Sequence, residues 1–192
     1  MSEWARRRST SSWTNGRKPS WRAGSRTTAG RLSSQSERGT EVPQHMSQVH
    51  HVGITVSDVD ASLHFYADLL AGERIGPLDR SGPRIDQVTG YPGVVVRQAF
   101  VRPPDGTAVI ELLQYVGGSP VVLDPDNGHV GAAHVAITVH DLDAVLVRLQ
   151  AQGVEAVSDP IVCSAPMEGF RAVYVLDPDR IRVELLQPPG RS

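Results

Sequence analysis

The chain contains one pattern twice, and this repeat constrains the fold more than any other feature. Residues 51–63, HVGITVSDVDASL, match residues 134–146, HVAITVHDLDAVL, at nine of thirteen aligned positions. The similarity returns further on, where VIELLQY (109–115) matches RVELLQP (182–188). Segments with the same apolar pattern bury the same faces, so the sequence predicts two modules of one fold. These span about residues 48–116 and 131–188.

Each copy opens with a strand in which every second residue is apolar. The apolar positions are Val52, Ile54 and Val56 in the first copy and Val135, Ile137 and Val139 in the second. Strand alternation places His51 and His134 on the opposite face, among small residues. His50 is expected to point to the helix side. The apolar faces are predicted to pack against the helices that follow.

Those helices are expected to begin at Ser57 or Asp58 and near Asp141, and the second to end at Gly153. Two or three further strands follow in each copy, with turns at PPDG and DPDR. The first copy has ten more residues than the second, and the Gly/Pro-rich segment 72–93 is expected to hold them as a loop. This order predicts an α+β fold in which two sheets curl around a pocket.

Residues 1–45 differ from the rest of the chain. They contain nine Lys/Arg and three Asp/Glu, whereas residues 46–192 contain ten and eighteen. Such a basic, Ser/Arg-rich segment is predicted to be disordered. Three interpretations stay open: a targeting segment, a nucleic-acid-binding arm, or a start codon assigned too early, with Met46 as the true start of a domain covering 46–192.

Composition excludes several classes of protein. No stretch has the length and apolar character of a membrane span or of a secretory signal, so a cytoplasmic protein is expected. Cys163 is the single cysteine, which rules out an intramolecular disulfide and a cysteine-based zinc cluster. Nucleic-acid binding is not expected.

Two glutamates occupy equivalent places in the last strand of each copy. Glu111 and Glu184 lie within very apolar strands, where an unpaired carboxylate is costly to bury. A bound cation would compensate. Together with His51 and His134 they form a two-imidazole, two-carboxylate set, which suits one ion of Zn²⁺, Ni²⁺, Co²⁺, Mn²⁺ or Fe²⁺.

These motifs carry a resemblance to a known family. HVGITVSDVDASLHFYADLLAG, AVIELLQY, HVAITVHDLDAVLVRLQAQGV and VYVLDPDRIRVELLQ resemble the vicinal oxygen chelate superfamily, which includes glyoxalase I, methylmalonyl-CoA epimerase and extradiol dioxygenases. The resemblance covers about residues 48–188 and implies paired βαβββ modules that form a cupped mixed sheet around a divalent metal. By position it assigns the metal ligands to His51, Glu111, His134 and Glu184. The carboxylate at Glu111 favours the glyoxalase-like set, because the epimerases usually have an amide at one such position.

The resemblance also implies an activity. We expect a metal-dependent lyase or isomerase that stabilises an enediolate or enolate of a small carbonyl substrate, with Glu184 as the first and Glu111 as the second candidate base. Candidate substrate contacts are Arg80, Arg84, Met167 and Phe170. A homodimer is expected. Two alternatives stay open, an extradiol ring-cleaving dioxygenase and a non-catalytic drug-binding protein.

Overall fold

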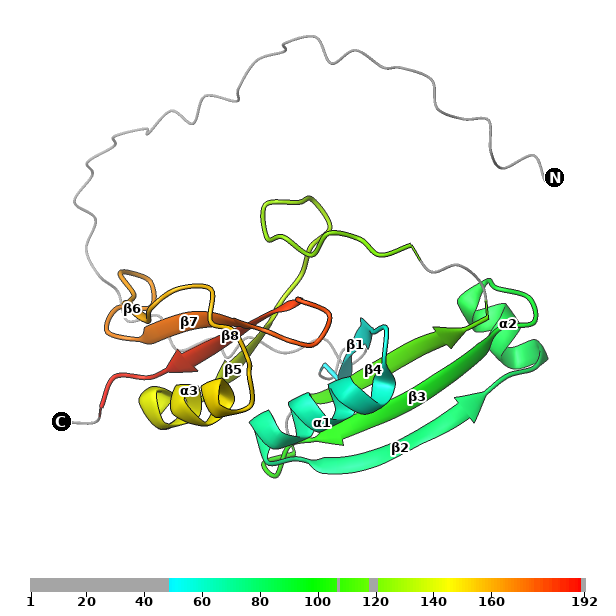
Figure 1. Ribbon diagram of the computed structural model, residues 1–192, viewed down its shortest axis with the longest axis horizontal. Coiled ribbons are helices and arrows are strands. Elements are labelled where there is room, and N and C mark those ends of the chain that lie inside the picture. The colour runs from blue at the N-terminus through cyan, green and yellow to red at the C-terminus, as the bar shows by residue number, and fades with distance from the viewer. Residues whose placement is uncertain (1–48, 107, 118–120, 191–192) are drawn as a thin grey trace, which may run out of the picture. The chain divides into compact units, whose positions relative to one another are not determined.

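The computed structural model describes residues 49–106, 108–117 and 121–190 (Figure 1). The predicted tail, residues 1–45, lies outside the described residues, as do residues 46–48 at the start of the predicted domain. The interpretations of that segment therefore stay predictions.

The first module has one long helix against a four-stranded sheet. Its elements are β1 (His51–Thr55), α1 (Val59–Leu70), β2 (Glu73–Arg80), α2 (Pro83–Thr89), β3 (Val95–Arg102) and β4 (Val109–Val116). The strand order is β1-β4-β3-β2, with β1 parallel to β4 and the other pairs antiparallel. The helix buries Val59, Leu63 and Tyr66 and partly buries Leu70 in the core.

The second module repeats this arrangement with a shorter middle. Its elements are β5 (Val135–Thr138), α3 (Leu142–Ala151), β6 (Ile161–Val162), β7 (Arg171–Leu176) and β8 (Arg182–Gln187). The strand order is β5-β8-β7-β6, with β5 parallel to β8. The α+β class and the duplicated βαβββ order are thus confirmed.

The expectation of a loop over residues 72–93 is wrong. Most of this segment forms β2, which pairs antiparallel with β3, and the short helix α2. Gly76 and Pro77 fall at a register shift between the paired positions Ile75 and Leu78, so the strand passes through residues typical of turns. Pro83 lies in the first turn of α2, where its missing N–H costs nothing.

The two main helices begin in the same way. The Asp58 carboxylate accepts hydrogen bonds from the backbone N–H groups of Asp60 and Ala61 at 2.9 and 3.1 Å. Asp141 accepts one from the N–H of Ala144 at 3.0 Å. Both are N-cap residues, which confirms the predicted helix starts.

A second duplicated contact joins each helix to its own sheet. Gln114 of β4 accepts a hydrogen bond from the N–H of Val59 at 3.3 Å, and Gln187 of β8 accepts one from the N–H of Leu142 at 3.0 Å. Arginines of the neighbouring strands complete the contact through ion pairs to the first helical turns, Arg97 with Asp60 and Arg171 with Asp143. The repeat therefore extends to the polar contacts that set the helix position.

A buried hydrogen bond links the two modules. The Tyr66 hydroxyl of α1 donates to the Asp177 carboxylate, in the β7–β8 turn, at 3.0 Å, and both residues are at most 4% exposed. The second oxygen of Asp177 accepts the N–H groups of Asp179 and Ile181 at 2.9 and 2.8 Å. Burial raises the pKa of Asp177, and burial together with Asp177 raises that of Tyr66. Residues of both modules share one apolar core around this bond.

Replacing Tyr66 with Phe is expected to lower the free energy of unfolding by about 1–3 kcal/mol, because it leaves a buried carboxylate oxygen without its donor. Urea denaturation measures the loss. Tyr91→Phe is the matched control, because that side chain is 62% exposed. Equal stability of the two variants would contradict the role given to Tyr66.

Candidate metal centre

Each module brings one histidine and one glutamate together. His51 Nε2 lies 3.2 Å from Glu111 Oε2, and His134 Nε2 lies 3.2 Å from Glu184 Oε2. We call each pair a half-site. The parallel pairing of the first and last strands produces both, since β4 places Glu111 opposite Gly53 and β8 places Glu184 opposite Ala136.

The half-sites are partly open to solvent. The side chains of His51 and Glu111 are 42% and 13% exposed, and those of His134 and Glu184 are 37% and 21% exposed. The carboxylates are thus mostly covered while the imidazoles reach outward. In this arrangement the imidazole nitrogen and the carboxylate of a half-site can both bind an ion that approaches from the solvent side.

Glycine at position 53 leaves room for the first half-site. A Cβ atom there would lie 3.3 Å from Glu111 Oε2, closer than ordinary van der Waals contact. The carboxylate therefore lies over a backbone position without a side chain.

The first half-site has polar neighbours that the repeat pattern did not reveal. The Gln98 amide donates a hydrogen bond to Glu111 Oε1 at 2.5 Å, and Arg80 Nε donates to the Gln98 carbonyl oxygen at 3.3 Å. His50 Nδ1 lies 2.8 Å from His51 Nδ1. The expectation that His50 points to the helix side stays a prediction, and the structure adds that its ring contacts that of His51.

The second half-site has different neighbours. The ring of Tyr174 stands edge-on to that of His134, with centroids 5.2 Å apart, and its hydroxyl lies 3.4 Å from His134 Nε2. Burial and the nearby Glu184 raise the pKa of Tyr174. Ala172 faces Leu186 here, as Gln98 faces Leu113 in the first module, so its methyl group stands where the first module has an amide.

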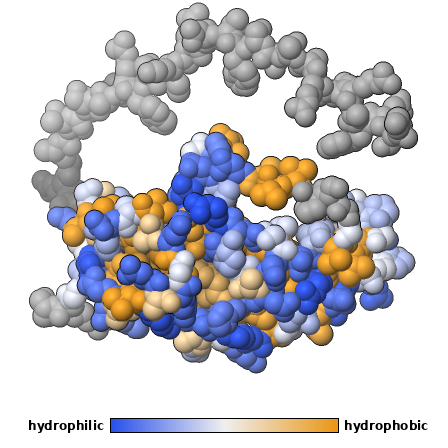
Figure 2. Space-filling model, viewed as in Figure 1, coloured by the Kyte–Doolittle hydropathy of each residue, from blue (hydrophilic) through white to orange (hydrophobic). Residues whose placement is uncertain are grey.

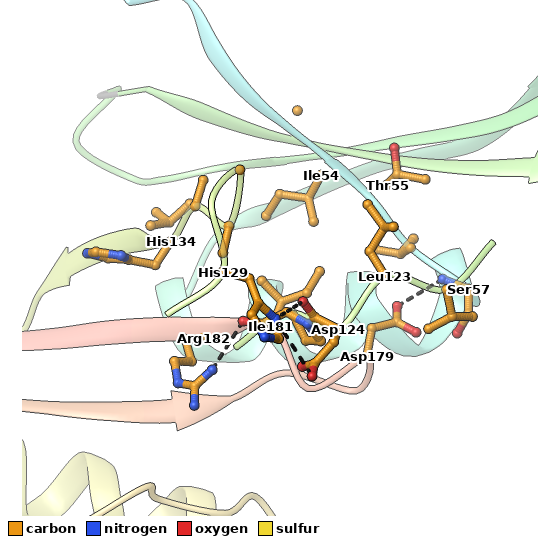
Figure 3. A pocket seen from close by; sticks show the side chains of 18 of the residues that line it. Ile54, Thr55, Ser57, Leu123, Asp124, His129, His134, Asp179, Ile181 and Arg182 are labelled. Atoms are coloured by element: carbon orange, nitrogen blue, oxygen red, sulfur yellow. Dashed lines mark hydrogen bonds and ion pairs between the residues drawn. The ribbon is translucent and has the colours of Figure 1, made fainter. Parts of the chain in front are cut away.

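The two half-sites stay separate in one chain. Among the residues that the structure describes, no three His, Cys, Asp or Glu side chains gather closely enough to hold a metal ion. Figure 3 shows the imidazole of His134 pointing away from Ile54 and Thr55 of β1. A single chain in this conformation therefore presents two incomplete sites.

A cleft of about 820 Å³ opens beside His134, which is the one residue of the two half-sites that lines it (Figure 3). One wall is β1, including Gly53, and another is the segment between the modules, which ends at His134. Residues of α1, of β4 and of the β7–β8 turn also line it, together with Arg182, the first residue of β8. The cleft is large enough for a small organic molecule.

None of the four predicted substrate contacts lines this cleft. Arg80 ends β2 and contacts Gln98, so it reaches the first half-site indirectly. Arg84 lies exposed on α2. Met167 and Phe170 belong to the turn before β7, where the Phe170 N–H donates to the Met167 carbonyl at 3.1 Å. Their roles in substrate binding stay predictions.

Replacing Gln98 with Ala is expected to weaken divalent-metal binding by about 10–100-fold, because residues that orient a ligand have effects of this size. Isothermal titration with Ni²⁺ or Zn²⁺ measures the affinity. The exposed Gln152 at the end of α3 provides the control, Gln152→Ala, which is expected to bind metal like the unchanged chain. Unchanged affinity in Gln98→Ala would contradict an orienting role.

The duplicated βαβββ modules, each with its His–Glu pair on the corresponding strands, define a class of two-module α+β proteins. The chain belongs to the Glyoxalase/Bleomycin resistance protein/Dioxygenase superfamily, whose family model matches residues 48–185. This confirms the resemblance found in the sequence.

The individual relatives share less than a third of their residues with this chain. The chain is 29% identical to a 2-epi-5-epi-valiolone epimerase from an Actinomyces species over 74% of its length and 80% of the relative's. It is 30% identical to a probable lactoylglutathione lyase from Synechocystis, over 74% and 96%. A glyoxalase family protein structure from Bacillus cereus superposes with a TM-score of 0.64 at 26% identity, covering 76% of this chain and 96% of that one. The described residues include no helix capable of spanning a membrane.

Proposed function

We propose that the protein is a divalent-metal-dependent lyase or isomerase that acts on a small carbonyl compound. The observation that carries this proposal is the His–Glu pair at 3.2 Å, present once in each module. Relatives named as a lactoylglutathione lyase and as an epimerase support this class of reaction.

The residues of the half-sites fit a divalent ion. His51, Glu111, His134 and Glu184 would hold it, since imidazole nitrogens and carboxylate oxygens are ligands that Ni²⁺, Zn²⁺, Co²⁺, Mn²⁺ and Fe²⁺ accept. The missing side chain at Gly53 leaves the room that Glu111 Oε2 takes up. When bound, the metal supplies positive charge where negative charge develops on a substrate oxygen.

Two chains are needed to complete such a site in the observed conformation. Each half-site offers two donors, and the described part of one chain brings no third His, Cys, Asp or Glu to either. A two-fold dimer would place the first half-site of one chain against the second half-site of the other, and would form two equal sites. This agrees with the predicted homodimer.

The two glutamates have different surroundings, which supports giving them different roles. Glu111 is held by the Gln98 amide on Oε1, so it stays in place as a ligand. Glu184 has the methyl group of Ala172 at the corresponding position, so no side-chain amide holds its carboxylate from there. We therefore assign proton transfer to Glu184, which takes a proton from carbon next to the carbonyl and returns it to the adjacent carbon or to the opposite face of the same carbon.

Solvent exchange tests the proposal. The full chain is purified, loaded separately with Ni²⁺, Zn²⁺, Co²⁺ or Mn²⁺, and incubated in D₂O with S-lactoylglutathione or 2-epi-5-epi-valiolone. Mass spectrometry then measures deuterium at the carbon-bound position. Metal-dependent incorporation into either compound, or into another hydroxy- or keto-compound of a wider panel, is expected. Oxygen-consuming ring cleavage of a catechol, or tight ligand binding without metal or turnover, would favour the dioxygenase or the drug-binding alternative instead.

A further inference from the structure

The first sheet carries a row of polar side chains that begins at its half-site and ends at its outer edge. Each of the four strands supplies one residue: His51 from β1, Glu111 from β4, Gln98 from β3 and Arg80 from β2. The Gln98 amide donates to the Glu111 carboxylate, and Arg80 Nε donates to the Gln98 carbonyl oxygen at 3.3 Å. A guanidinium is thus connected to the proposed metal ligands through one amide.

The Arg80 side chain is exposed and has no carboxylate partner among the described residues. It ends β2, the outermost strand of its sheet, and Figure 2 shows mainly hydrophilic residues along this edge of the first module. Arg80 uses its Nε, toward Gln98, and no acceptor in the described part of the chain contacts its two terminal nitrogens. Of the nine arginines in residues 49–106, 108–117 and 121–190, six form ion pairs: Arg74, Arg97, Arg102, Arg171, Arg180 and Arg182. The outward end of the Arg80 guanidinium is therefore free to bind an anion.

Apolar side chains lie on both sides of Gln98 along this row. Leu78 of β2 and Leu113 of β4 are the residues directly opposite Gln98, so they share its face of the sheet. Leu78 is 52% exposed. Leu113 also lies beside the half-site, since a Cβ atom at Gly53 would be 3.9 Å from its Cδ1. The surface between the half-site and Arg80 therefore suits a short carbon chain.

The second module has no cation at the corresponding place. Ala172 takes the position of Gln98 in the register. Arg80 pairs with the residue two before Gln98, and the N–H of Cys163 donates at 2.7 Å to the carbonyl of Phe170, the residue two before Ala172. Cys163 thus takes the position of Arg80. The row of polar groups that ends in a positive charge belongs to the first module, which makes the two sides of the proposed site different.

We infer that Arg80 binds an anionic group of the substrate, a carboxylate or a phosphate, while neighbouring oxygens of the same molecule lie at the half-site of His51 and Glu111. A guanidinium is planar and always charged, and its N–H groups match the oxygens of either anion. The inference rests on the proposed function and narrows its substrate class to carbonyl compounds that carry a negative charge. Arg80 is then a specificity residue, because the anionic group fixes which end of the molecule lies over the first module.

The test compares three hydroxyketones that share the same pair of adjacent oxygens. Hydroxyacetone is neutral, 5-hydroxylevulinate carries a carboxylate, and dihydroxyacetone phosphate carries a phosphate. Isothermal titration measures their binding to the full chain loaded with Ni²⁺ or Zn²⁺ at one fixed ionic strength, because salt screens exposed charges. The variants are Arg80→Gln and Arg80→Lys, and circular dichroism checks their folding. The matched control is Arg148→Gln, which alters an exposed arginine of α3 that also has no ion pair among the described residues.

We expect at least one charged compound to bind the unchanged chain and the control about 10–100-fold more tightly than hydroxyacetone does, the usual effect of a hydrogen bond between charged groups. Arg80→Gln is expected to abolish this preference while metal affinity and hydroxyacetone binding stay the same. Arg80→Lys keeps the charge but loses the fork, so it is expected to retain part of the preference. The charged compound that binds more tightly identifies the anion as a carboxylate or a phosphate.

Three results would overturn the inference: an unchanged chain that binds the three compounds alike or binds none of them, a preference that persists in Arg80→Gln, or an equal loss of metal and of all three compounds in that variant. The last result would mean that Arg80 only positions Gln98. Titration after treatment with EDTA separates the two proposals. An Arg80-dependent preference in a chain that binds no metal would support the anion contact and contradict the metal site, whereas metal binding without any preference would do the reverse.

Discussion

Glu184→Gln is expected to keep much of the bound metal while proton exchange between substrate and solvent falls by about 10²–10⁴-fold, the usual size of a general-base contribution. The amide oxygen can still approach the ion, but the amide cannot accept the proton that the carboxylate accepts. Deuterium incorporation at saturating metal measures the loss. The assignment rests on the contrast between Glu111, which accepts a hydrogen bond from Gln98, and Glu184, which has Ala172 at the corresponding position.

Glu111→Gln is the matched control in the other module. It alters the carboxylate that Gln98 holds, so we expect weaker metal binding but a smaller loss of exchange once the metal is saturating. The opposite order, with full exchange in Glu184→Gln and none in Glu111→Gln, would move the base to the first module.

Two inactive chains are expected to restore a site when they are combined. One chain carries His51→Ala and Glu111→Ala, and the other carries His134→Ala and Glu184→Ala. Each lacks one half-site and is expected to bind no metal tightly on its own. In a mixed dimer the intact half-sites of the two chains meet once, so metal binding and proton exchange return at one of the two sites.

Different affinity tags on the two chains allow the mixed dimer to be purified and its metal content measured. The homodimers of each variant, purified with the same two tags, are the control. A mixed dimer without metal would contradict a site shared between two chains.

The sequence predicted those parts of the site that repeat. Alternation along HVGITV and HVAITV placed His51 and His134 on the face opposite the apolar residues. The matching ELLQ segments located the glutamates, whose oxygens lie 3.2 Å from these imidazoles in the structure. A repeat carries this information because equivalent residues take equivalent positions in both modules.

Features outside the repeat could not be predicted in this way. Gln98 and Ala172 occupy matching positions but share no chemistry, so their different effects on the glutamates appear only through strand register. The strand β2 was not predicted, because Gly76 and Pro77 interrupt the alternation of apolar and polar residues along it. The Tyr66–Asp177 hydrogen bond joins residues 111 positions apart in the sequence. Periodicity describes only residues close together in the chain, so it could not predict this contact.

The metal content of the purified full chain tests the central claim most directly. Elemental analysis after growth with Ni²⁺, Zn²⁺, Co²⁺ and Mn²⁺ is compared with that of His51→Ala, His134→Ala and a control, His64→Ala, whose imidazole is 66% exposed on α1. The account predicts one divalent ion per chain in the unchanged protein and in the control, and little in either half-site variant. Full metal content in His51→Ala and His134→Ala, or none in the unchanged protein, would contradict it.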